Sequence, residues 1–181
     1  MQQEKLRSYL HAVILFVIVI VDRRKEERER VWTVTSRATK RIERITREFK
    51  SKTYPTVDVQ GHHVIPGFID IHIHGGYGED AMDASMDGLK HLSEQLLSEG
   101  TTSFLATTMT QSDDSIHRAL QNIADYFQIQ NRHDAAEIVG IHLEGPFISE
   151  HKVGAQHPKY VQRPSIEKIK TFQQTANQLI K

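Results

Sequence analysis

The chain has 181 residues, with 23 Lys and Arg, 23 Asp and Glu, and no cysteine. The lack of cysteine excludes disulfides and thiolate metal sites within it, so a metal ion would have to be bound by His, Asp or Glu. The zero net charge gives no whole-chain argument for nucleic-acid binding, although residues 1–52 carry 14 basic and 7 acidic side chains and residues 53–181 carry 9 and 16.

The N-terminal part joins an apolar run to a long charged stretch. The apolar run Leu10–Val21 has 12 residues, short of the roughly 20 that a membrane-spanning helix needs. Charged residues follow it at Asp22–Glu27 without a small-residue cleavage site, so a signal peptide or anchor is the less favoured alternative. From there to Lys52 the sequence lacks Gly and Pro, which predicts a charged helix. Residues 1–52 are thus predicted to be an atypical segment, with no nucleic-acid or membrane partner expected.

Residues 53–181 alternate between apolar, β-branched runs and amphipathic helical patterns. The first run, Val64–His74, predicts a strand. A helix is predicted from Ser85 to Glu99, because leucines recur at helical spacing and Gly100 stands where a C-terminal cap belongs. A second strand is predicted at Thr102–Thr108.

Two more helices and one more strand are predicted toward the C-terminus. Ser112 and Ser165 are each expected to be the N-cap of a helix, and the third strand is predicted at Glu137–Leu143. The apolar positions of the two helices are Ile116, Leu120, Ile123 and Phe127 in the first, and Ile166, Ile169, Phe172, Ala176 and Ile180 in the second. Three consecutive βα units predict an α/β fold with a parallel sheet.

A metal site is predicted where two of these strands end. His72 and His74 lie on the same face of the first strand, since side chains alternate along a strand, and imidazole is a common metal ligand. Gly75-Gly76 would end the strand and leave room beside the pair. Glu144 follows the third strand, and the carboxyl ends of parallel strands meet at one rim. Exposed strand histidines, and a glutamate that only borders a turn, are the alternatives.

Other polar residues near these strands are given lesser roles. Asp70 is predicted either to orient a histidine or to pack into the barrel floor. His142 is predicted to be a core histidine or one that supports a ligand. The remaining histidines are predicted to be ordinary surface residues: His62, His63, His91, His117, His133, His151 and His157.

Several blocks of the sequence resemble a known family. Residues 66–76 (PGFIDIHIHGG) resemble the first-strand signature of the amidohydrolase superfamily of metal-dependent (β/α)8 barrels. The blocks GGYG, EGTTS, ATT, IHLEGPF and KVGAQ, at residues 75–78, 99–103, 106–108, 141–147 and 152–156, are similar to the superfamily's deacetylases of N-acetylglucosamine 6-phosphate. The resemblance covers Val57 to Lys181, and it implies a fold made of the first three βα units of such a barrel.

The resemblance also implies a reaction and residue roles. It implies hydrolysis of the acetamide of N-acetylglucosamine 6-phosphate to glucosamine 6-phosphate and acetate. It makes His72, His74 and Glu144 ligands of a divalent ion (Zn, Fe, Mn or Co) in a binuclear centre, and Ala155 a substrate contact through its backbone. The implied partner is a small amino-sugar phosphate, in a homodimeric, cytoplasmic enzyme.

The chain also departs from the family pattern. A (β/α)8 barrel has eight strands and about 250 residues, whereas three units are predicted here. The family's further ligands and its proton-handling aspartate are expected on later strands beyond Lys181, so no catalytic residue is assigned within the chain. Residues 1–52 contain no glycine and are predicted not to be family-like. A truncated fragment is the resulting hypothesis, with the edge of its third strand left unpaired.

Two alternative functions stay open on the sequence. One is another amidohydrolase, acting on a cyclic amide or a nucleobase. The other is a non-catalytic truncated fragment that binds a metal weakly or pairs with other chains.

Overall fold

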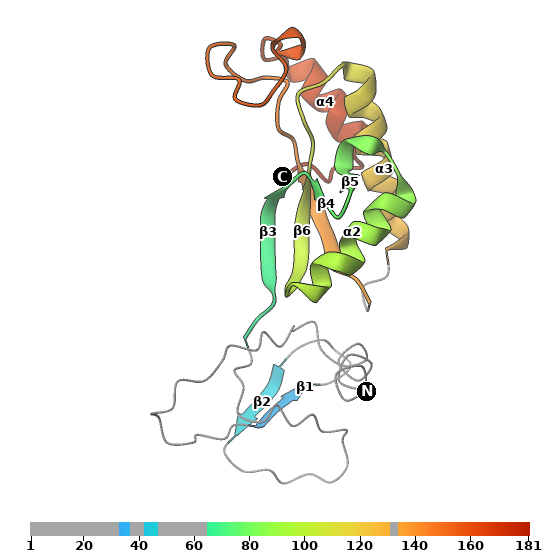
Figure 1. Ribbon diagram of the computed structural model, residues 1–181, viewed down its shortest axis with the longest axis vertical. Helices are drawn as coiled ribbons and strands as arrows, with labels where there is room; N and C mark the ends of the chain where they lie inside the picture. The colour runs from blue at the N-terminus through green and yellow to red at the C-terminus, as the bar shows by residue number, and fades with distance from the viewer. Residues whose placement is uncertain (1–32, 37–41, 47–64, 131–133) are drawn as a thin grey trace. The chain divides into compact units, whose positions relative to one another are not determined.

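A computed structural model of the chain describes residues 33–36, 42–46, 65–130 and 134–181 (Figure 1). The chain divides into two compact units, Met1–Gly67 and Phe68–Lys181. The predicted boundary between residues 52 and 53 lies outside the described residues. All the candidate site residues belong to the second unit.

The first unit contains an antiparallel pair of strands, β1 (Thr33–Ser36) and β2 (Ile42–Thr46). The predicted charged helix is therefore wrong over these two segments, and the rest of that prediction lies outside the described residues. β-Branched residues explain the difference, because two substituents on Cβ restrict χ1 in a helix but suit a pleated strand. The two strands contain six of them, namely Thr33, Val34, Thr35, Ile42, Ile45 and Thr46.

The second unit is built on a parallel sheet of three strands, β3 (Phe68–Ile73), β6 (Thr101–Thr107) and β7 (Glu137–His142), in that spatial order. Helix α2 (Met86–Ser98) follows β3, and helix α3 (Asp113–Ile129) follows β6. Both helices lie to one side of the sheet in Figure 1. The predicted α/β class with a parallel sheet of three strands is confirmed.

A short hairpin lies between β3 and α2. Its strands are β4 (Gly75–Gly76) and β5 (Glu79–Asp80), and the 3-10 helix η1 (Ala81–Asp83) follows. The backbone N–H of Ala81 donates to the carbonyl of His74 at 2.8 Å, which closes the chain back onto the end of β3. Strand β3 thus ends at the predicted glycine pair, and His74 lies at the junction of strand and hairpin.

The helices of this unit begin as predicted, with N-caps at Ser112 and Ser165 and a helix start at Ser85. The side chains of Ser85, Ser112 and Ser165 each accept a hydrogen bond from the backbone N–H three residues later. These bonds satisfy N–H groups that have no partner inside the helix. At the other end of α2, Gly100 has a φ of +96°, a conformation that glycine adopts without a Cβ clash.

The core lies between the sheet and its helices. Most of the predicted stripes are buried, and Phe127 and Leu97 are partly exposed. The residues of α2, α3 and the sheet at the centre of this core are Leu89, Leu92, Leu96, Ile116, Leu120, Ile123, Phe104, Ile138 and Ile141. This packing holds β6 and β7 in place, and with them the backbone positions from which the site residues project.

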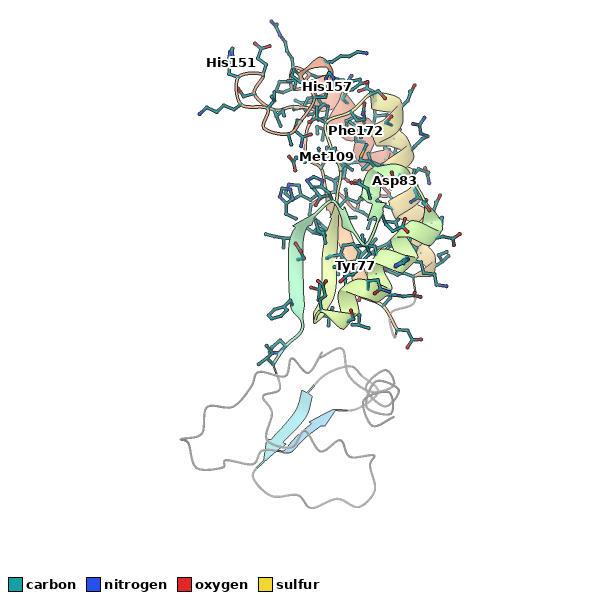
Figure 2. All side chains as sticks on the ribbon, viewed as in Figure 1. Tyr77, Asp83, Met109, His151, His157 and Phe172 are labelled. Atoms are coloured by element: carbon teal, nitrogen blue, oxygen red, sulfur yellow. The ribbon has the colours of Figure 1, made fainter. Side chains whose placement is uncertain are left out.

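Helix α4 (Ile166–Thr175) follows the last loop and departs from its predicted pattern. Phe172, labelled in Figure 2, is buried, but the side chain of Ile166 is 70% exposed. The helix ends at Thr175, and Ile180 lies instead in a parallel bridge with Ile141. The backbone N–H of Ile141 donates to Leu179 at 2.9 Å, so the edge of β7 is paired there, contrary to prediction.

The described part of the chain has no helix that is both long and apolar enough to cross a membrane. Large apolar side chains are nevertheless exposed on β3, at the other edge of the sheet: Phe68, Ile69 and Ile71 are 51%, 67% and 66% exposed.

An ion pair joins α4 to the start of α3. Lys168 Nζ donates to Asp113 Oδ2 at 2.5 Å, and Gln162 Nε2 donates to Asp113 Oδ1 at 2.8 Å. Because Gln162 belongs to the loop between β7 and α4, these bonds also anchor that loop to α3. The hydrogen bond from Gln162, and then that from Lys168, hold the pKa of Asp113 below its ordinary value of 3.8.

We expect Asp113→Asn to lower the stability of the chain by less than about 1 kcal/mol at neutral pH, because both charged side chains are more than a third exposed. A carboxyl whose pKa is lower in the folded state stabilises the protein above its unfolded pKa. The difference in urea stability between wild type and variant should therefore disappear as the pH falls below 3.8. Asp114→Asn changes an exposed acid of the same turn and is the control. If Asp114→Asn lost as much stability, with the same dependence on pH, the stabilising role of the ion pair at Asp113 would be contradicted.

Candidate metal centre

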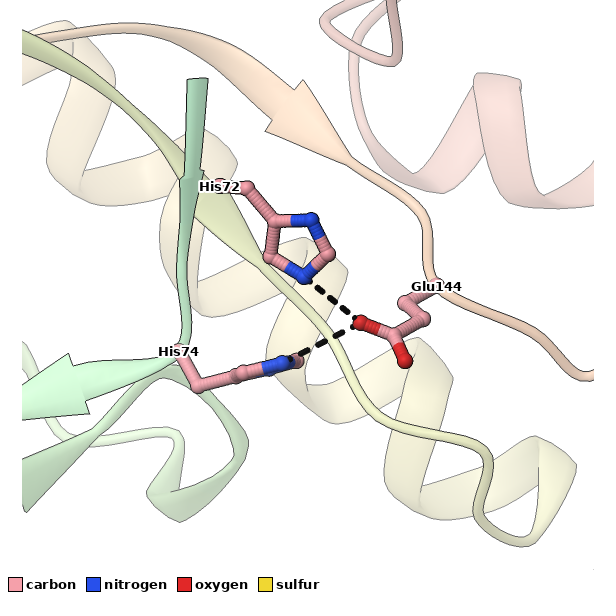
Figure 3. A group of neighbouring side chains, drawn as sticks. All are labelled: His72, His74 and Glu144. Atoms are coloured by element: carbon pink, nitrogen blue, oxygen red, sulfur yellow. Dashed lines mark hydrogen bonds and ion pairs between the residues drawn. The ribbon is translucent and has the colours of Figure 1, made fainter. Parts of the chain in front are cut away.

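Three side chains with metal-ligand chemistry converge at the carboxyl end of the sheet. Glu144 Oε2 lies 2.7 Å from His72 Nε2 and 3.1 Å from His74 Nε2 (Figure 3). One ligand atom from each residue lies within 4.8 Å of the others, so a single ion could contact all three. In the part of the chain that the structure describes, this is the one group of three or more His, Cys, Asp or Glu residues with such spacing.

The strand geometry explains why these residues meet. His72 and His74 are two positions apart, so they point to the same side, while Ile73 between them packs against the core. The backbone N–H of Ile73 donates to Thr107 Oγ1 at 3.0 Å, which ties the end of β3 to the end of β6. Glu144 lies in the loop that follows β7. Its side chain reaches the two histidines past the end of β6 (Figure 3).

His74 is held in the tautomer that suits a metal ligand. Its Nδ1 lies 3.2 Å from the backbone carbonyl of Thr107, and a carbonyl oxygen can only accept, so Nδ1 must donate. In the neutral ring the lone pair then lies on Nε2, which points at Glu144 Oε2. Both atoms then present lone pairs to the space between them, where a metal ion could accept both. The donor set of two imidazoles and one carboxylate fits a divalent transition metal.

His142 supports the site from the side. Its ring lies against that of His72, with 4.4 Å between the centroids, and its Nδ1 donates to the carbonyl of Ile71 at 3.1 Å. Of the two predicted roles for His142, the structure favours support of a candidate ligand. Asp70 has a different task from either one predicted, because its Oδ1 accepts from the backbone N–H of His72 at 2.9 Å.

The side chain of Gln156 also contacts the site, and sequence reasoning gave it no role. It is buried, with 6% of its surface exposed, and its Nε2 donates to Glu144 Oε1 at 2.5 Å. The signal in the sequence was only its place in the KVGAQ block, since glutamine is not a usual metal ligand. Ala155, the predicted substrate contact, is exposed directly beside it in the same loop.

The other described histidines lie outside this group. His91, His151 and His157 are exposed, as predicted. His117 differs from the prediction, because it is half-buried, packs its ring against Phe172 and pairs with Thr175 Oγ1 at 2.9 Å. His62, His63 and His133 lie outside the described residues.

Comparison with known sequences identifies relatives of this chain. Residues 63–181 match the model of the amidohydrolase family. An N-acetylglucosamine-6-phosphate deacetylase from Lysinibacillus sphaericus is 38% identical over 173 residues, covering 96% of this chain and 43% of the relative. An N-acetylglucosamine-6-phosphate deacetylase from Bacillus subtilis is 49% identical over 119 residues, covering 65% of this chain and 30% of the relative. The chain therefore spans less than half the length of these curated relatives.

That residues 1–52 do not resemble the family stays a prediction.

Solved structures support the same fold. The crystal structure of an N-acetylglucosamine-6-phosphate deacetylase from Pasteurella multocida matches with a TM-score of 0.66 at 31% identity. The match covers 77% of this chain and 36% of that one.

Proposed function

Because the chain belongs to the amidohydrolase family, we propose that it forms part of a (β/α)8 barrel that hydrolyses N-acetylglucosamine 6-phosphate to glucosamine 6-phosphate and acetate. The observation that supports this most strongly is the convergence of His72, His74 and Glu144 at the carboxyl ends of β3 and β7. Catalytic groups of such barrels lie at that end of the strands. Relatives named for this activity indicate the substrate.

The proposed ligands are His72 and His74 through Nε2 and Glu144 through Oε2. A divalent ion bound by them would lower the pKa of a coordinated water toward about 7 and polarise the acetamide carbonyl. Zinc, iron, manganese and cobalt all accept imidazole and carboxylate ligands. We propose a binuclear centre in the complete enzyme, to which His72, His74 and Glu144 would contribute ligands.

The residues of this chain would prepare the site for hydrolysis of the amide. The reaction breaks the C–N bond, adds the oxygen of water to the acetyl carbon and leaves a proton on the amine. Thr107 keeps His74 Nε2 free to bind, and His142 limits the movement of the His72 ring. We propose that the exposed backbone at Ala155 contacts the sugar, since its loop is anchored next to Glu144. The proton-transfer group is not assigned to this chain.

A chimaera tests the proposal with an intact barrel. Residues 63–181 would replace the matching segment of the Bacillus subtilis relative, and acetate release from N-acetylglucosamine 6-phosphate would be measured with Zn, Fe, Mn or Co. We expect activity that is lost on His72→Ala and Glu144→Ala. A chimaera that folds and binds metal but releases no acetate would contradict the proposal.

The same assay separates the remaining candidates. An N-acetylgalactosamine-6-phosphate deacetylase from Escherichia coli O157:H7 is 36% identical over 104 residues, so the galactosamine epimer is a second candidate substrate. Ring opening of a cyclic amide would favour another amidohydrolase. The purified 181-residue chain, assayed alone, tests the non-catalytic alternative.

We propose that the complete enzyme is a cytoplasmic homodimer. Size-exclusion chromatography with light scattering would measure its mass in solution and so test whether it is a dimer.

A further inference from the structure

We propose that Gln156 is a positioning residue that holds the carboxylate of Glu144 with one oxygen toward the proposed metal position. The inference rests on the proposed metal centre and adds a residue to it. Gln156 lies in the loop after β7, far along the chain from His72 and His74, yet its amide contacts the carboxylate of Glu144 directly. Among the described residues, Gln156 is the one glutamine that is buried, with 6% of its surface exposed.

The orientation of the Gln156 amide follows from its two neighbours. The backbone N–H of Thr110 points at one end of the amide, at 2.6 Å, and an N–H can only donate, so the oxygen Oε1 must lie there. The carboxylate of Glu144 lies at the other end, at 2.5 Å, and an ionised carboxylate can only accept, so Nε2 must lie there. Both contacts demand the same orientation, so the amide has one satisfactory placement.

This placement divides the two oxygens of Glu144 between two tasks. Oε1 accepts from Gln156, while Oε2 faces both imidazoles, at 2.7 Å and 3.1 Å. Without the amide, the carboxylate could turn about its terminal torsion, which is a soft, roughly two-fold rotation. The donor therefore pre-orients Oε2 toward the metal position. Since Thr110 follows β6, the same amide ties Glu144 to the neighbouring strand's loop.

Metal affinity is the readout that separates positioning from a purely structural role. Gln156→Met keeps the length of the side chain and removes the hydrogen bonds of its amide. We expect the 181-residue variant to bind Co²⁺ about 10-fold to 100-fold more weakly than wild type, the usual cost of losing a group that orients a ligand. The visible absorption band of bound Co²⁺ should also change, because it reports ligand geometry.

Gln130→Met is the matched control. The amide of Gln130 also bonds at both ends, accepting from the N–H of Ile138 at 2.8 Å and donating to its carbonyl at 3.1 Å. We expect this variant to lose stability but to bind Co²⁺ as wild type does. Equal affinities for wild type and Gln156→Met would overturn the inference. A wild-type chain that binds no Co²⁺ would instead overturn the proposed metal centre.

A measurement on the wild-type chain covers the case in which Gln156→Met does not fold. In NMR spectra, the side-chain NH₂ signals of Gln156 should exchange slowly with water and shift when Zn²⁺ is added. The NH₂ signals of Gln130 should not shift. Unshifted Gln156 signals at saturating Zn²⁺ would overturn the inference.

Discussion

Glu144→Ala is expected to weaken Co²⁺ binding by the chain more than about 100-fold, above the range for groups that only orient a ligand. Glu144 supplies the one carboxylate of the trio, and its Oε2 faces both histidine Nε2 atoms. Without this carboxylate, only the two imidazoles remain to bind the cation. Titration with Co²⁺, followed by visible absorption, measures the effect, and circular dichroism checks that the variant is folded.

Two further variants make the result specific. Glu150→Ala removes a glutamate from the same loop, where the side chain is 77% exposed, and should bind Co²⁺ like wild type. Glu144→Asp keeps the charge on a shorter side chain and should fall between wild type and Glu144→Ala. Wild-type affinity in a folded Glu144→Ala variant would show that the metal, if bound, lies elsewhere.

Gly75→Ala is expected to destabilise the chain strongly, by about 3 kcal/mol. A Cβ at residue 75 would lie 2.0 Å from the backbone oxygen of Glu79 and 2.7 Å from Cα of Asp80. Backbone atoms cannot rotate away as a side chain can, so β4 and β5 would have to separate. Because Gly75 directly follows His74, the variant should also weaken Co²⁺ binding.

The neighbouring glycine provides the control for this prediction. A Cβ at Gly76 would meet Leu92 Cδ1 at 3.5 Å, an ordinary contact with a side chain. Urea unfolding of both variants measures the difference, and Gly76→Ala should stay close to wild type. Equal stability of the two variants would show that the hairpin does not form as described.

Local pattern predicted most of the second unit. The caps at Ser112 and Ser165 and the stripe on α3 depend on a few neighbouring residues, and each was found where the spacing indicated. The predictions failed where distant contacts decide. The pattern could not show that Ile166 stays exposed or that Ile180 leaves the helix to bridge Ile141, because both depend on which surface lies opposite.

The charged segment shows a second kind of failure. Its composition of Lys, Arg and Glu favours a helix, whereas the β-branched residues at 33–36 and 42–46 lie in paired strands. Pairing between two strands is a contact that no single segment encodes. The prediction of a helix followed the high content of Lys, Arg and Glu and gave too little weight to the β-branched residues.

For the candidate site, the sequence alone determined that His72 and His74 share a side and that Glu144 ends a strand, because alternation and strand ends are local properties. Only the tertiary structure decided that Glu144 Oε2 meets both rings past the end of β6, and that Gln156 holds the other oxygen. Those contacts join residues 12 to 72 positions apart. Their geometry depends on how strands and loops pack, which spacing along the chain does not specify.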